Sequence, residues 1–139
     1  PAAIFNIATL TGAAKVGLGQ DLAGFFTSES VLAESVERAA FNFGDLAWRL
    51  PLYLPYERQL KSQVATMTNC ASSRFGGAIT AALFLNRFVE KIPFVHFDIY
   101  GWCDREQGAL REAGGSGQGL QLLIGIVESF LKTELNKEF

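Results

Sequence analysis

The run Thr9-Leu10-Thr11-Gly12 has the residue types expected of a turn that holds a ligand. Threonine hydroxyls can hold a turn or a bound group, and glycine lets the backbone approach a ligand closely. The run follows an apolar stretch that begins at Ala2 and is typical of a buried strand. In open α/β sheets, ligands bind beyond the carboxyl ends of the strands. We therefore predict that residues 9–12 form a substrate-binding turn.

The single histidine, His96, lies two residues before Asp98 on one face of an expected strand. Such a pair can bind a metal, but one imidazole and one carboxylate leave the coordination incomplete, and a di-metal site needs several converging carboxylates. We therefore predict a buried polar pair with a structural role and assign no metal ligand within this chain. Most other acids occupy expected helix surfaces: Glu29, Glu34, Glu37, Glu57, Glu90 and Glu128.

Two other arrangements could carry chemistry. Cys70 and His96 could act as nucleophile and base, although Cys70 lies in an expected polar loop without a nucleophile-elbow motif. The glycine-rich run Gly114–Gly117 precedes an expected helix and could bind an anion there. The alternative for this run is a plain surface connection.

Strand-like and helix-like segments alternate along the chain, which predicts an α/β fold with a mixed sheet flanked by helices. Gly44 is expected to end the first long helix, and Pro93 to separate the second from the strand that follows. The expected elements are a strand at 2–8, a helix at 28–43, an extended segment at 46–54, a short helix at 55–62, a strand at 64–68, helix 78–89, strand 94–100 and a helix spanning 120–131.

Composition excludes several classes of partner. The 139 residues are 49% hydrophobic and carry 12 basic against 14 acidic residues, a net charge of −2 that gives no reason to expect nucleic acid or an anionic membrane. Two cysteines, Cys70 and Cys103, fit a reducing, cytoplasmic setting. No apolar run has the length and purity of a membrane span, and no secretory leader is evident. Because the first residue is Pro1, we expect the chain to be part of a longer protein.

Several segments, in order along the chain, match motifs of one family. They are Ala8–Ala13 (ATLTGA), Gly44–Leu52 (GDLAWRLPL), Tyr56 with Leu60–Ser62, Ala65 with Asn69, Gly76–Leu85 (GGAITAALFL) and His96–Trp102 (HFDIYGW). Together they resemble the M17 leucyl aminopeptidase family of di-metal exopeptidases. The last segment is nearer to the H-F-D-x-Y-A-W form of a bacterial subgroup.

The resemblance implies that residues 1–139 are the C-terminal portion of the catalytic domain, with the metal-binding part and the N-terminal domain absent. Two divalent ions, zinc or manganese, would be held by residues upstream, because the family's lysines, aspartates and N-T-D-A-E-G-R segment match nothing here. A bicarbonate general base, peptide substrates and a hexameric assembly are also implied. Trp48 and Arg49 would be structural, as a core aromatic and a member of an ion pair.

The same resemblance implies a role for five residues. Backbone groups of Leu10 and Gly12 would hold the peptide, Thr9 would form a wall of the pocket for the first side chain, and the Leu10 amide would help to hold bicarbonate. Tyr100 and Cys103 would line the first-residue pocket. Tyr100 stands where better-known members have alanine, so its ring should narrow that pocket; the alternative is that it only packs against neighbours.

The function predicted from these observations is the release of N-terminal amino acids from peptides by the complete enzyme. This segment would supply the positioning turn and part of the pocket, and alone it would be inactive. The alternative is a non-catalytic binding or structural subunit derived from the same family.

Overall fold

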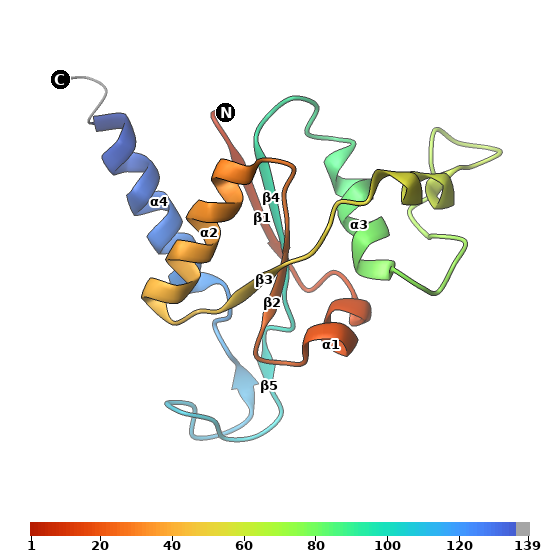
Figure 1. Cartoon of the computed structure of the whole chain (residues 1–139). Helices are drawn as coiled ribbons and strands as arrows, with labels where there is room; N and C mark the ends of the chain where they lie inside the picture. Colours follow the sequence, from red (N-terminus) through yellow and green to blue (C-terminus); the bar gives the residue numbers. More distant parts are fainter. Residues whose placement is uncertain (136–139) are drawn as a thin grey trace.

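The computed structural model describes residues 1–135 and consists of a central sheet with helices on both faces (Figure 1). Its elements, in chain order, are β1 (Ile4–Ala8), α1 (Gly12–Leu18), β2 (Ala23–Phe26), α2 (Ser30–Phe43), β3 (Ala47–Arg49), the 3-10 helix η1 (Leu54–Leu60), α3 (Gly77–Asn86), β4 (Phe94–Asp98), β5 (Trp102–Cys103), β6 (Gly114–Gly115) and α4 (Leu120–Leu135).

The main sheet has the strand order β1-β4-β2-β3. β1 and β4 are parallel, with Ala8 opposite Asp98, whereas β2 runs antiparallel to β4 and parallel to β3. The predicted mixed sheet flanked by helices is confirmed. Because of these directions, β1 and β4 end at the same end of the sheet, and the loops that follow them come together there.

Alternation along the strands divides the core into two layers. Val95 and Phe97 of β4 face α2 and α4, in a cluster that also contains Val36. On the other face, Phe26 of β2 packs with Ala82 of α3 and with part of α1. Figure 1 shows α2 and α4 on one side of the sheet and α1 and α3 on the other.

The long helices agree with the sequence except near their ends. α2 begins at Ser30, with Glu29 at the N-cap position in place of the expected Ser28, and it ends at Gly44 with a left-handed φ of 68°. α3 ends at Asn86 rather than Val89, because the chain tightens there: the Phe88 amide bonds to the carbonyl three residues earlier.

The expected strand at 64–68 is wrong, because this segment forms a loop. The Ser62 hydroxyl accepts hydrogen bonds from the Val64 and Ala65 amides at 3.2 and 3.1 Å. Local side-chain acceptors of this kind compete with strand pairing for the backbone donors. The expected strand at 94–100 is also shorter and ends at Asp98.

The prediction that Trp48 is a core aromatic is wrong. β3 is an edge strand, and Trp48 is 63% exposed, beside Phe41 in a groove of about 730 Å³. The Arg49 guanidinium donates to the carbonyl of Thr27 at 3.2 Å, and the structure records no ion pair for it among the described residues. The edge position of β3 leaves Trp48 without the burial that the sequence suggested.

Candidate substrate site

The turn after β1 is held by one buried carboxylate. Asp98, the last residue of β4, is 1% exposed and lies opposite Ala8. Its Oδ1 accepts hydrogen bonds from the Leu10 and Thr11 amides at 3.1 and 3.0 Å, and its Oδ2 accepts one from the Thr11 hydroxyl at 2.6 Å. Three donors on one ionised group form strong, charge-assisted bonds. The predicted turn is therefore fixed from within the sheet, with Thr9, Leu10 and Gly12 exposed.

The same turn starts α1. Thr11 is the N-cap, and its hydroxyl oxygen accepts from the Ala14 amide at 3.2 Å while it donates to Asp98. A threonine N-cap satisfies one of the free amides at a helix start. Asp98, Thr11 and the first turn of α1 therefore form one connected network.

His96 is buried, as predicted, but it does not hydrogen-bond to Asp98. Its Nδ1 lies 2.7 Å from Asn6 Oδ1 on β1, its ring stacks on Phe26 with centroids 6.0 Å apart, and its buried Nε2 has no hydrogen-bond partner. Burial lowers the pKa of His96 below 6.5, although the charge of Asp98 and the hydrogen bond to Asn6 oppose this. Cys70, in an exposed loop, makes no hydrogen bond to the ring, so the proposed nucleophile–base pair is not formed.

A second loop, between β4 and β5, approaches the turn. The amides of Tyr100 and Gly101 both donate to Gln118 Oε1, at 2.9 and 3.0 Å, and Gln118 Nε2 donates to the carbonyl of Gln20 at 3.4 Å. Gly101 has a φ of +70°, and the ideal position of a Cβ there lies 3.5 Å from Thr9 Cγ2. Thr9 and the Tyr100–Gly101 segment are therefore neighbours, as a shared pocket wall requires.

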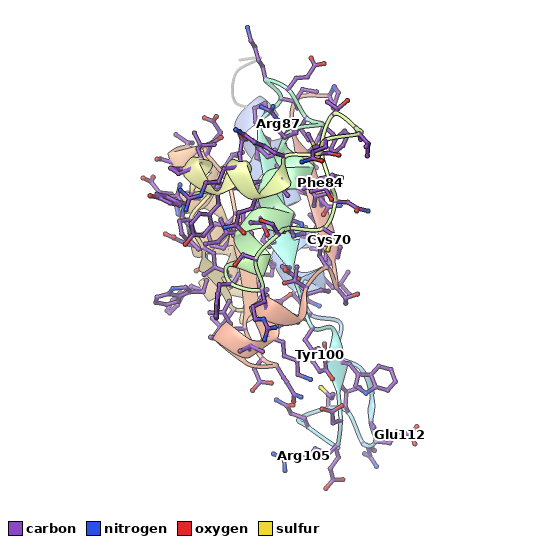
Figure 2. The ribbon with its side chains drawn as sticks, turned by 90° about the vertical axis from the view of Figure 1, so that its right-hand side faces the viewer. Cys70, Phe84, Arg87, Tyr100, Arg105 and Glu112 are labelled. Carbon is purple, nitrogen blue, oxygen red and sulfur yellow. The ribbon has the colours of Figure 1, made fainter. Side chains whose placement is uncertain are left out.

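The ring of Tyr100 faces α1. Lys15 Nζ lies 3.6 Å from the ring centroid, and the phenolic oxygen is 3.4 Å from Asp104 Oδ1. Figure 2 shows Tyr100 at the end of the molecule where the chain extends to Arg105 and Glu112, while Cys70 lies farther up beside α3. The structure thus brings Tyr100 close to the turn and keeps Cys70 away from it.

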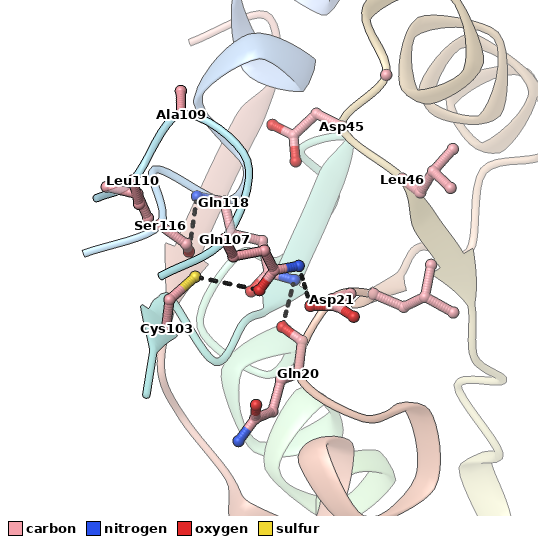
Figure 3. Close-up of a pocket in the computed structure, with 12 residues that line it drawn as sticks. Gln20, Asp21, Asp45, Leu46, Cys103, Gln107, Ala109, Leu110, Ser116 and Gln118 are labelled. Carbon is pink, nitrogen blue, oxygen red and sulfur yellow. Dashed lines mark hydrogen bonds between the residues drawn. The ribbon is translucent and has the colours of Figure 1, made fainter. Parts of the chain in front are cut away.

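Cys103 faces a different space. It lines a cavity of about 430 Å³ together with Gln107, Gln118 and a mixture of polar and apolar residues, and its thiol donates to Gln107 Oε1 at 3.6 Å (Figure 3). Tyr100 does not line this cavity. Cys103 therefore lies on the same loop as Tyr100, but it faces a separate hollow.

A carboxylate of this chain is bound at the N-terminus of α4. Asp45 accepts hydrogen bonds from the amides of Gly119 and Leu122 at 3.0 and 3.2 Å. The glycine-rich run before this helix is partly a strand, β6, which pairs with β5. A carboxylate of the chain thus already uses amides that an external anion would need at this helix start.

Within residues 1–135 no group of three or more His, Cys, Asp or Glu side chains is placed to hold a metal ion. The described helices also include none that is long and apolar enough to cross a membrane. Sequence reasoning missed Asp98 as the anchor of the turn, Gln118 as the anchor of the second loop, and Lys15 beside Tyr100. For Asp98, the only signals in the sequence were a carboxylate at the end of one expected strand and a polar turn at the end of another.

Comparison with known proteins gives consistent matches. The family model for the catalytic domain of the cytosol aminopeptidase family, Peptidase M17, matches residues 1–124. A probable cytosol aminopeptidase of Nostoc punctiforme is 46% identical over 127 residues, which cover 90% of this chain and 25% of the relative. A probable cytosol aminopeptidase of Cyanothece sp. is 44% identical, also with 90% and 25% coverage. The chain thus spans about a quarter of the length of the curated relatives that it matches.

Solved structures agree. The crystal structure of a cytosol aminopeptidase from Coxiella burnetii is similar with a TM-score of 0.84 and 42% identity, over 93% of this chain and 28% of that one. The bottromycin maturation enzyme BotP, solved in complex with Mn, gives a TM-score of 0.86 and 36% identity over 93% and 29% of the two chains.

Proposed function

This chain belongs to the cytosol aminopeptidase family, and from that premise we propose that it forms one wall of the substrate site of a metal-dependent aminopeptidase. In this proposal residues 1–139 are the C-terminal portion of the catalytic domain. The complete protein releases N-terminal amino acids from peptides, acts in the cytoplasm and assembles as a hexamer.

The observation that carries the proposal is the exposed turn at residues 9–12, held by Asp98 beside the Tyr100 loop. A turn fixed before the substrate arrives presents its backbone groups without further ordering, and such preorganisation favours binding and correct orientation. In this arrangement the backbone of Leu10 and Gly12 positions the peptide, and Thr9 forms part of the pocket wall.

Tyr100 and Cys103 are the proposed specificity residues. The Tyr100 ring lies next to Lys15, so it closes the side of the pocket toward α1. Cys103 faces the neighbouring cavity, so it would contact only a substrate side chain that extends past the loop. A ring at position 100 reduces the room available to the first residue of the substrate.

Two divalent ions, zinc or manganese, would supply the activated water and polarise the scissile carbonyl. The described residues do not fit a metal centre, because no group of three suitable donors converges. We therefore assign the ions to the remainder of the complete protein. The role of this chain is to bind and orient the peptide.

A bicarbonate base would share a donor that is already engaged. The Leu10 amide donates to Asp98 Oδ1 at 3.1 Å. In our proposal Leu10 helps to hold bicarbonate only if this amide is shared between the two anions. The proposed binding of the peptide by this turn does not depend on that sharing.

The proposal is tested with the longest reading frame that encodes this chain. The purified protein is supplied with Zn²⁺ or Mn²⁺ and assayed on a panel of aminoacyl amides and short peptides, with a chelator-treated sample as control. We expect release of the N-terminal residue that is lost on chelation and restored by metal. A metal-loaded protein that binds peptides without cleaving them would instead support the non-catalytic alternative.

A further inference from the structure

We infer that Asp98 is a positioning residue of the substrate turn: its buried carboxylate sets which way the backbone of residues 9–11 faces. The inference rests on the proposed function, since the turn is the proposed peptide-binding element. It goes further by giving one buried side chain control over the orientation of that element.

The carboxylate of Asp98 lies at the end of β4. Asp98 ends β4 opposite Ala8, which ends β1, so its side chain lies directly beneath the turn that continues from β1. At 1% exposure the carboxylate is almost fully removed from water, and without hydrogen-bond partners its burial would lower the stability of the folded protein. Three donors from the turn, at 3.1, 3.0 and 2.6 Å, replace the missing water.

The carbonyl groups of the turn face away from Asp98. The peptide bonds of the turn are trans, so each carbonyl points opposite to the amide of the same peptide unit. Because the amides of Leu10 and Thr11 point toward Asp98, the carbonyls of Thr9 and Leu10 point away from it. Both residues are exposed, so these two carbonyl oxygens are presented outward as neighbouring acceptors for the N–H groups of a peptide.

The hydroxyl of Thr11 joins the carboxylate to the start of α1. It donates to Asp98 Oδ2 and accepts from the Ala14 amide, which fixes the direction of its proton. Alanine in place of Asp98 removes both carboxylate oxygens, so all three donors of the turn lose their acceptor. Asparagine is a weaker change, because its one oxygen can still accept from both amides and only the Thr11 hydroxyl loses its acceptor.

The experiment uses the full-length protein and compares Asp98→Ala with Thr27→Val. Thr27 is a matched control because it is also buried and its hydroxyl also accepts from a backbone amide, that of Glu29 at 3.1 Å. It follows β2, which runs antiparallel to β4, so it lies at the opposite end of the sheet from the turn. Assays are run at a temperature where both variants are folded by circular dichroism.

We expect kcat/KM for short peptides to fall about 100-fold in Asp98→Ala, the order of loss that a displacement of ~1 Å causes, and to remain at the wild-type value in Thr27→Val. Amide hydrogen exchange supplies a readout that is independent of activity. In Asp98→Ala the amides of Leu10 and Thr11 lose their acceptor and should lose protection, while the amides within β1 keep theirs.

A second pair of variants covers the case in which Asp98→Ala does not fold. Thr11→Val should lower kcat/KM because it removes the hydroxyl, and Thr11→Ser, which keeps it, should restore the wild-type value. The inference is overturned if Asp98→Ala or Thr11→Val loses no more kcat/KM than Thr27→Val, or if Leu10 and Thr11 keep wild-type protection in Asp98→Ala. An inactive wild-type protein would refute the proposed function instead, and the exchange measurement would still test whether Asp98 orders the turn.

Discussion

Replacing Tyr100 by alanine tests whether its ring limits the size of the first substrate residue. In the structure the ring lies 3.6 Å from Lys15 Nζ and is half-buried, and its hydroxyl makes only a long contact of 3.4 Å with Asp104. The ring therefore borders the helix that follows the substrate turn, and it is not part of either buried core cluster. Its removal should open space near the turn more than it disturbs the core.

The size of the effect follows from these contacts. Loss of the contact with Lys15 should cost about 0.5–1 kcal/mol of stability, the range for an exposed cation–π pair. This is well below the roughly 3–5 kcal/mol typical of a core aromatic cut to alanine. Room for one or two additional methylenes in a pocket changes relative kcat/KM by about 10–200-fold, or ~1–3 kcal/mol. We therefore expect a shift toward bulkier N-terminal residues with a small loss of stability.

The assay measures kcat/KM on a panel of aminoacyl amides from alanine to phenylalanine, beside a thermal melt of each variant. Tyr100→Phe is the matched control, because it keeps the ring and its contact with Lys15 and loses only the long hydroxyl contact. This control should keep the wild-type substrate ranking, and metal content should be the same in both variants. An unchanged ranking in Tyr100→Ala together with a large fall in Tm would refute the pocket assignment and show that the ring only packs.

Three further outcomes are expected. Burial lowers the pKa of His96 below 6.5, so as the pH falls the imidazole is protonated in the unfolded chain before it is protonated in the folded protein. The free energy of unfolding should therefore decrease below about pH 6.5, by up to ~1.4 kcal/mol per pH unit, and denaturant titrations at pH 7.5 and 5.5 should show a smaller decrease in His96→Leu. Gly76→Ala should destabilise the protein by about 1–3 kcal/mol, because φ is +70° and the new Cβ would lie 2.8 Å from Tyr56 Cε2. Gly44→Ala, at φ +68° with open space, isolates the backbone strain, and equal losses in both would rule out the clash. Calorimetry of this chain alone should detect no stoichiometric Zn²⁺ or Mn²⁺, and tight binding of two ions would contradict our assignment of the metal ligands to the rest of the protein.

The elements with a clear hydrophobic period were predictable from the sequence, whereas short elements such as β2 and α1 were not. α2 and α4 have 14 and 16 residues, long enough for the helical spacing to show. β2 has four residues that are all buried, so it shows no alternation, and α1 has seven residues with two glycines among them. The strand expected at 64–68 does not form, because the Ser62 side chain accepts hydrogen bonds from the backbone amides that strand pairing would have used.

The candidate site was predictable at the level of the turn but not at the level of what holds it. Asp98 and Leu10 are 88 positions apart in the sequence, and they meet only because β1 and β4 pair in parallel. The contact between Lys15 and Tyr100 and the bonds from Gln118 to the Tyr100 loop depend in the same way on how distant elements pack. Residue types identified a polar turn and a carboxylate, but the register of the sheet was needed to join them.

In the proposed enzyme, substrate positioning and metal binding would be carried by different parts of the protein. The groups that fix the turn and the Tyr100 loop, namely Asp98, Thr11, Gln118 and Gln20, all lie in this chain and bond to one another's segments. A metal centre needs several donors that converge on one point, and the described residues have no such group. Substrate positioning can therefore be built by hydrogen bonds around a sheet end without the ions. On the proposed function, this chain would set which peptide is held and in which orientation, and the rest of the protein would supply the bond-breaking chemistry.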